Sequence, residues 1–383
     1  MNTVHMLAMS CASRRQRRLW TMRFTLARWI GALSIAATCG AMLAGCASTS
    51  PGSQAWHRSD ARVLEVASIG SFHVGGHAVT LSGLPSRSIV FSPGAPPTVV
   101  DPNGAFEVGQ MYVQYVKLAH PRGALPVLLW HGGGLTGVNW ETTPDGRDGW
   151  QMAFLHAGYD VYVSDAVERG RASWARYPEL YRSEPFFRSK REAWLLFRIG
   201  PSYSDAPSAR ATFPGSQFPI DAFDAFGKQL VPRWATNDAL TQAAYDALVQ
   251  RVCPCIVIAH SQAANFAFTA ALHAPDRIRA IVALEPSSAP DPEHADLHAI
   301  AAIPQLFVWG DNLDKSAFWG GLVRASLRYQ QALAAQGGRV ETLSLPERGI
   351  HGNSHMLMLD RNSDQIAEMV QTWLAERLPP SDK

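Results

Sequence analysis

The chain has 383 residues, of which 47% are hydrophobic and 17% are charged, so it can bury a large core and lacks the composition of a disordered protein. Its net charge of +2 is concentrated at the start: residues 1–45 hold six arginines and no acidic residue, which leaves 28 basic and 32 acidic residues, a net charge near −4, for the rest. A body with this charge lacks the basic face of a nucleic-acid-binding protein, so no nucleic-acid partner is expected.

The first 45 residues have the order of a secretory signal peptide. Arginines up to Arg28 precede the apolar run Trp29–Gly45, which ends in small residues directly before Cys46. This run is slightly shorter than the ~20 residues of a membrane-spanning helix, which favours a cleaved signal over a single anchor. Met22 would give a signal of ordinary length and is the expected start.

The segment Leu43–Cys46 (L-A-G-C) resembles the bacterial lipobox, in which the cysteine is acylated and becomes the first residue. We therefore expect a lipid on Cys46, followed by a small, polar tether over residues 46–66. This implies a lipid-anchored protein in the periplasm of a Gram-negative bacterium. Ala47 is not the aspartate that retains lipoproteins in the inner membrane of enteric bacteria, which favours the outer membrane.

Only two of the five cysteines belong to the expected folded body, Cys253 and Cys255, because Cys11 and Cys39 leave with the leader. In an extended strand, residues two apart lie ~6.6 Å from one another, at the limit of disulfide reach. The spacing therefore favours two buried thiols over a bond. No zinc-type Cys/His spacing occurs, so neither a metal nor a cofactor is expected.

The elements expected before residue 170 are mainly strands. Alternating apolar residues predict strands over Ser71–Leu81 and Phe106–Leu118, with turns at Gly75-Gly76 and Pro102-Asn103-Gly104. The continuous apolar run Leu125–Trp130 predicts a strand buried on both faces. A glycine-rich loop, a helix over Trp150–Ala157 and a strand over Asp160–Ser164 follow.

The loop after the Leu125–Trp130 strand reads His131-Gly132-Gly133-Gly134. Glycines allow a backbone to approach a substrate oxygen closely. An H-G-G-G run upstream of a nucleophilic serine is typical of a loop that donates one N–H to an oxyanion hole, here from Gly133 or Gly134. A plain glycine turn is the alternative.

Residues 170–235 hold 13 of the 37 aromatic residues, interrupted by prolines and arginines, and do not resemble sheet core. We interpret this segment, called the insertion below, as a cap that supplies an apolar pocket, with Trp174, Phe187 and Trp194 as lining candidates. The alternative is a structural insertion that packs on itself. Residues 67–169 and 236–379 would then form the main domain.

Strands and helices alternate through the second half of the chain, which predicts a mostly parallel sheet with helices on both faces. The expected helices are Ala239–Val252, Gln262–His273, Leu322–Ala335 and Asp364–Glu376. The expected strands are Cys255–Ala259, Ile278–Leu284, Gln305–Trp309 and Val340–Ser344.

Ser261 lies between an apolar strand and an apolar helix, the context of a nucleophile elbow. The usual G-x-S-x-G motif is altered, because alanines, Ala259 and Ala263, replace both glycines. In such an elbow the backbone N–H of Gln262 is the second oxyanion donor. An ordinary strand–turn–helix serine is the alternative.

A general base would come last in the chain, where His351 and His355 both follow the final strand. A metal site at these two histidines lacks a third ligand nearby. Two acids could orient the base, Glu285 and Asp311, each at the end of a strand, and position alone favours Asp311.

Five short stretches resemble the bacterial esterase 713-like carboxylesterases, a subfamily of the α/β-hydrolases, over about residues 70–377. They are Glu141–Arg147, Ala259–Gln262, Leu284–Pro286, His351–Met356 and Asp360–Asn362. The resemblance implies a triad of Ser261, Glu285 and His355. Two features differ: Gly133-Gly134 stand where that subfamily has adjacent cysteines, and Ala263-Ala264 replace a Ser-Gly pair.

These features together predict an α/β-hydrolase fold with a cap insertion, and a serine carboxylesterase that acts on a small-molecule ester. Thioesterase, lactonase, amidase or peptidase activity would use the same site. A lipid-anchored binding protein on an inactive hydrolase scaffold is the alternative from another class.

Overall fold

The structure is a computed structural model that describes residues 63–378. The expected signal peptide, Cys46 and nearly all of the expected tether lie outside the described residues. Among the described residues no helix is both long and apolar enough to cross a membrane.

A central sheet of eight strands has the order β1-β4-β6-β5-β7-β8-β9-β10. Pairing is antiparallel from β1 through β4 to β6 and parallel from β6 to β10, which confirms the predicted, mostly parallel sheet. The strands are β1 (Val66–Leu81), β4 (Gly104–Leu118), β5 (Val127–Trp130), β6 (Val161–Asp165), β7 (Cys255–His260), β8 (Ile278–Leu284), β9 (Gln305–Trp309) and β10 (Val340–Ser344).

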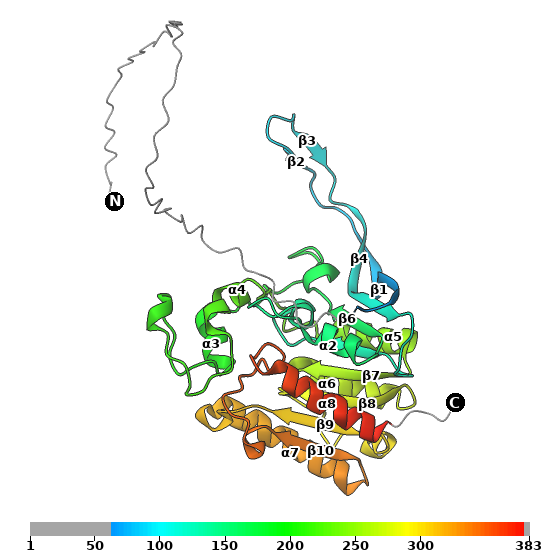
Figure 1. The fold of residues 1–383 in the computed structure, drawn as a ribbon. Helices are drawn as coiled ribbons and strands as arrows, with labels where there is room; N and C mark the ends of the chain where they lie inside the picture. Colours follow the sequence, from blue (N-terminus) through cyan, green and yellow to red (C-terminus); the bar gives the residue numbers. More distant parts are fainter. Residues whose placement is uncertain (1–62, 379–383) are drawn as a thin grey trace, which may run out of the picture. The chain divides into compact units, whose positions relative to one another are not determined.

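Helices cover both faces of this sheet (Figure 1). The strand period of two divides the β7 side chains between two clusters: Ile256 and Ile258 join one, Val257 and Ala259 the other. The first cluster includes α2 (Trp150–His156) and α8 (Ser363–Arg377), and the second includes α5 (Asp238–Val252), α6 (Gln262–His273) and α7 (Ala317–Ala335). Shorter helices are α1 (Val138–Glu141), α3 (Lys190–Leu196) and α4 (Phe223–Gly227).

Two local predictions were wrong, and one pair of strands was missed. Gly75-Gly76 makes no turn: both residues lie inside β1 with φ of 72° and 81°, and pairing with β4 continues on either side. A small hairpin of β2 (Arg87–Ile89) and β3 (Thr98–Val100) was not predicted, and it projects beyond β1 and β4 (Figure 1). Helix α7 begins at Ala317, five residues before the expected start, because the Ser316 side chain caps it by accepting from Trp319 N–H.

The two cysteines of the body form a disulfide bond, which corrects the expectation of free thiols. The estimate of ~6.6 Å assumed an extended strand. In the structure Cys253 ends α5 and Cys255 begins β7, so the chain turns at Pro254 and the two Cα atoms lie 4.4 Å apart. That separation is within disulfide range.

Candidate active site

Ser261 stands in a tight turn between β7 and α6. Its backbone has φ of 55° and ψ of −117°, and its N–H donates to Leu284 O at 2.9 Å. A non-glycine residue in this region costs ~1–3 kcal/mol and persists only where the surroundings hold it. The buried strand β7 and the helix that starts at Gln262 supply those surroundings, and the turn has the geometry predicted for a nucleophile elbow.

His131 fixes the glycine loop that follows β5. Its Nε2 accepts from Ala166 N–H at 3.0 Å, which leaves the proton on Nδ1 to donate to Gly132 O at 2.8 Å. Burial is the main cause that lowers the pKa of His131 to about 4, so the ring is neutral at physiological pH. No role for His131 was predicted from the sequence. In the structure its side chain anchors the glycine loop to the end of β6.

The glycine loop lies directly against the start of α6. A Cβ on Gly133 would lie 2.7 Å from Gln262 Oε1 and 3.0 Å from Arg233 Nη1, so only glycine fits without displacing them. Gly134 has φ of 74°, which L side chains rarely adopt. The N–H of Gln262 is in the first turn of α6, where backbone donors have no partner within the helix. The three predicted oxyanion donors therefore come from two adjacent segments.

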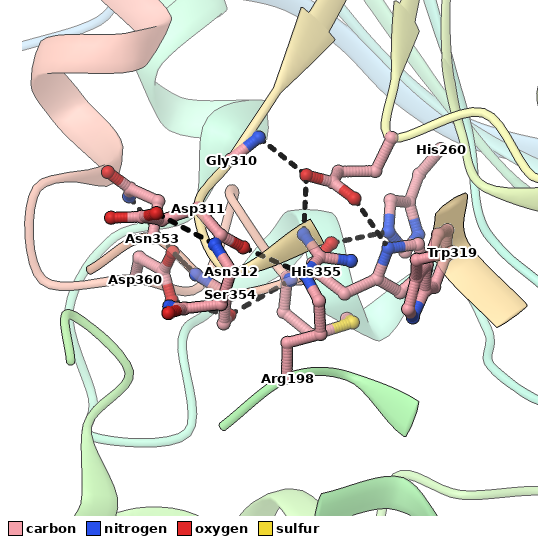
Figure 2. A network of polar contacts seen from close by, with 12 residues as sticks. Arg198, His260, Gly310, Asp311, Asn312, Trp319, Asn353, Ser354, His355 and Asp360 are labelled. Atoms are coloured by element: carbon pink, nitrogen blue, oxygen red, sulfur yellow. Dashed lines mark hydrogen bonds and ion pairs between the residues drawn. The ribbon is translucent and has the colours of Figure 1, made fainter. Parts of the chain in front are cut away.

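His355 is buried between aromatic rings. Its ring centroid is 4.3 Å from that of Trp319 and 5.3 Å from that of Phe197. Its Nδ1 lies 3.2 Å from Glu285 Oε2. Its carbonyl accepts from His260 Nε2 at 2.9 Å (Figure 2). These contacts fix the imidazole and leave Nε2 as the nitrogen that can accept a proton.

Glu285 is fully buried at the end of β8, and its carboxylate has three partners. Besides His355, Gly310 N–H donates to Oε1 at 2.5 Å and Arg198 Nη2 donates to the same oxygen at 2.7 Å. Arg198, Gly310 and His355, all labelled in Figure 2, thus converge on this one carboxylate. The resemblance had named Glu285, whereas position along the chain had favoured Asp311.

Asp311 contacts a different histidine, His351. Its Oδ2 lies 3.3 Å from Nδ1 of the exposed His351 and accepts from Gly352 N–H at 2.9 Å, and its Oδ1 accepts from Asn312 N–H at 2.7 Å. Asp311 thus fixes the loop before His355, and Glu285 is the acid that contacts His355 itself.

Arg198, which comes from the insertion, was missed by the sequence analysis. It is buried with φ of 55°, its Nε donates to Asp311 O at 2.9 Å, and its guanidinium lies 4.8 Å from the Trp319 ring centroid. Nothing in the sequence distinguishes it from the other arginines of the insertion. It links both candidate acids to the insertion.

Asp360 holds the loop that carries His355. This buried carboxylate accepts from Ser354 N–H at 2.8 Å, from Ser354 Oγ at 2.7 Å and from Asn353 Nδ2 at 2.9 Å. Burial raises the pKa of Asp360 to about 6. Its presence in the Asp360–Asn362 stretch was the available signal, but that stretch did not indicate a role.

The electrostatic surroundings keep His355 neutral. Burial and then the positive charges of Arg198 and Arg188 hold the pKa of His355 well below its usual value. The described residues include no hydrogen bond between Ser261 Oγ and His355. The two residues are linked indirectly: the ring of His260, which precedes Ser261, lies 4.5 Å from the His355 ring, and Ser261 N–H donates to Leu284 O, next to Glu285. Hydrogen bonds of this kind often form only in the substrate complex.

The three lining candidates lie in different surroundings. Trp174 is 52% exposed and packs against Trp234, Phe187 is 68% exposed, and Trp194 is fully buried against Phe223. The insertion reaches the site elsewhere, through Phe197 beside His355 and through Val231 N–H, which donates to Gly134 O at 2.9 Å.

Residues 63–378 contain no group of three His, Cys, Asp or Glu side chains that could hold a metal ion.

Two known proteins are similar to this chain over most of its length. A solved structure described as a novel bacterial esterase is 35% identical, covers 84% of this chain and 99% of its own, and superposes with a TM-score of 0.72. Residues 126–308 match the family model of the alpha/beta hydrolase fold. The chain belongs to the α/β-hydrolase family. A probable secreted lipase, phiG, from a fungus (Fungal sp. strain ATCC 74256) is also similar to this hydrolase, at 29% identity over 72% of the chain and 88% of the lipase.

Proposed function

We propose that this hydrolase is a serine carboxylesterase with Ser261, Glu285 and His355 as its triad. The observation that carries the proposal is the buried contact of 3.2 Å between Glu285 and His355, at the sheet edge where the strained Ser261 turn also lies. The esterase and lipase relatives support an ester as the substrate.

The proposed reaction has two steps. His355 Nε2 takes the proton of Ser261 Oγ as this oxygen bonds to the ester carbonyl carbon, and the resulting oxyanion is stabilised by N–H groups of Gln262 and of Gly133 or Gly134. The imidazolium then protonates the departing alcohol. Water attacks the acyl-enzyme with His355 again as base, and this releases the acid and restores Ser261.

The neutral state of His355 supports this role. A base must be unprotonated to accept a proton, and the lowered pKa of His355 keeps it so at neutral pH. The carboxylate of Glu285 then stabilises the imidazolium when it forms.

The direct test replaces the nucleophile. Ser261→Ala should lower kcat for short-chain aryl esters by ~10⁴-fold or more, because only binding and oxyanion stabilisation remain. Circular dichroism should show an unchanged fold, and a fluorophosphonate probe should label the parent but not the variant. Activity within about tenfold of the parent would place the nucleophile elsewhere.

A further inference from the structure

Two arginines of the insertion, Arg188 and Arg233, flank the candidate site without being used by the proposed chemistry. Arg233 Nη1 lies 3.0 Å from the position that a Cβ of Gly133 would occupy. Arg188 lies over the ring of Phe197, 5.6 Å from its centroid, and that ring is in turn 5.3 Å from His355. One guanidinium therefore borders the glycine loop, and the other is separated from His355 by the ring of Phe197.

The backbone holds these two arginines next to one another. Phe186 and Arg233 exchange backbone hydrogen bonds of 2.7 and 3.0 Å, and Val231 N–H donates to Gly134 O at 2.9 Å. The segments around residues 186–188 and 231–233 thus form a small paired unit attached to the glycine loop.

The positive charge of this pair is only partly neutralised. Arg188 Nη1 lies 2.6 Å from Glu192 Oε1, and Arg233 Nη2 lies 3.7 Å from Asp238 Oδ1. The side chains of both acids are 42% or more exposed, so water weakens these ion pairs. The Nε atoms of Arg188 and Arg233 are both buried without a hydrogen-bond partner among the described residues. Burial is the main cause that lowers the pKa of Arg188; the charge of Glu192 opposes this effect, and the positive charge of the nearby Arg233 adds to it.

We infer that Arg188 and Arg233 bind an anionic group of the substrate, so that the preferred ester carries a carboxylate. This inference rests on the proposed function. Guanidinium donors match a carboxylate in geometry and bind it more strongly in a partly buried site than in water. A carboxylate bound by Arg233 would lie close to the glycine loop, and so to the expected oxyanion donors.

The test compares esters that differ only in charge. One pair carries the charge on the acyl side, p-nitrophenyl hydrogen glutarate against p-nitrophenyl pentanoate. The other carries it on the alcohol side, 4-acetoxybenzoate against 4-acetoxybenzamide. We expect the parent to have the higher kcat/KM for the charged member of at least one pair. Arg188→Gln and Arg233→Gln should each lower that preference by about tenfold.

Arg182→Gln is the matched control, because Arg182 is an exposed arginine of the same insertion. It should leave the preference unchanged. In the parent, glutarate should inhibit more strongly than glutaramide, and added salt should weaken this inhibition. These measurements apply even if a variant fails to fold.

Equal rates for the members of both pairs, or a charge preference that survives both arginine substitutions, would overturn the inference. In either case hydrolysis that still depends on Ser261 would leave the proposed function intact. Hydrolysis of all four esters by Ser261→Ala would instead contradict the proposed function.

Discussion

The carboxylate of Glu285 is the most constrained group of the candidate site. It is fully buried, its backbone has φ of 49°, and Arg198, Gly310 and His355 all contact it. A buried polar group without partners destabilises a protein, so each of these contacts stabilises the buried side chain of Glu285. The acid proposed to orient the base is therefore held by a strand end, a neighbouring loop and the insertion together.

Glu285→Gln should lower kcat by ~10⁴-fold with the fold retained, the loss known when the orienting aspartate of a chymotrypsin-type protease becomes an amide. The amide cannot stabilise the imidazolium and favours the wrong tautomer. Asp311→Asn, measured beside it with the same aryl ester, should remain far closer to the parent, because Asp311 contacts His351. The reverse result, a collapse only in Asp311→Asn, would move the acid to the later strand.

The pH dependence of kcat/KM should report the charge near His355. Because the pKa of His355 is held well below 6.5, the acidic limb should lie below pH 6.5. Arg198→Gln removes a cation that disfavours the imidazolium, so the pKa should rise and the limb should move to higher pH. Arg198→Lys keeps the charge and should keep the limb near its position. An unmoved limb in a folded Arg198→Gln enzyme would show that Arg198 is only structural.

The identities of the candidate site residues could be predicted from the sequence more readily than the contacts between them. Ser261, Glu285 and the glycine loop follow strand ends that any parallel sheet brings to one edge, so motif and resemblance could find them. Asp360 contacts residues only six and seven positions before it, in the loop that carries His355. Arg198 and His131 act through contacts between segments far apart in the chain. Such contacts have no periodicity or spacing in the sequence that would reveal them.

At the scale of elements, the insertion contacts the site from two sides, through Phe197 and through Val231. We propose that it acts as a cap that sets substrate choice. Phe187→Ala should change relative rates among esters of different acyl length while the melting temperature stays near that of the parent, because Phe187 is 68% exposed. Unchanged selectivity would favour an insertion that only packs on itself.

Trp194→Ala is the contrasting variant. Trp194 is fully buried and its Nε1 donates to Ala211 O at 3.3 Å, so truncation should cost ~3–5 kcal/mol of stability. Chemical denaturation measures this loss. Aromatic density predicted the insertion as a unit, but density alone could not separate an exposed Phe187 from a buried Trp194.

The regular elements were predictable where burial imposes a period. Strands β8, β9 and β10 and helix α6 have the predicted bounds. In β9 and α6 the reason is plain, because β9 is a continuous buried run and α6 buries an apolar face. The hairpin of β2 and β3 was missed because each strand has three residues, most of them exposed, and carries no measurable alternation. The disulfide was missed because Pro254 turns the chain where a strand was assumed.

At the scale of the whole molecule, we propose that the protein is attached to the bacterial envelope by a lipid on Cys46, a residue outside the described part of the chain. Metabolic labelling with a fatty-acid analogue should tag the protein. Cys46→Ala should abolish the tag, because acylation requires the thiol. Labelling that persists in this variant would exclude Cys46 as the site.

The contact between Arg198 and Glu285 also limits how this molecule can be rebuilt. The insertion and the strand-end acid are 87 residues apart in the chain, yet they share one buried ion pair. A chimera that receives the corresponding insertion of another hydrolase would gain a new substrate surface and lose the cation that compensates its own acid. The insertion and the end of β8 therefore have to be replaced together. A chimera should fold and keep activity only when the incoming insertion supplies an arginine at position 198, or when Glu285 is replaced along with it.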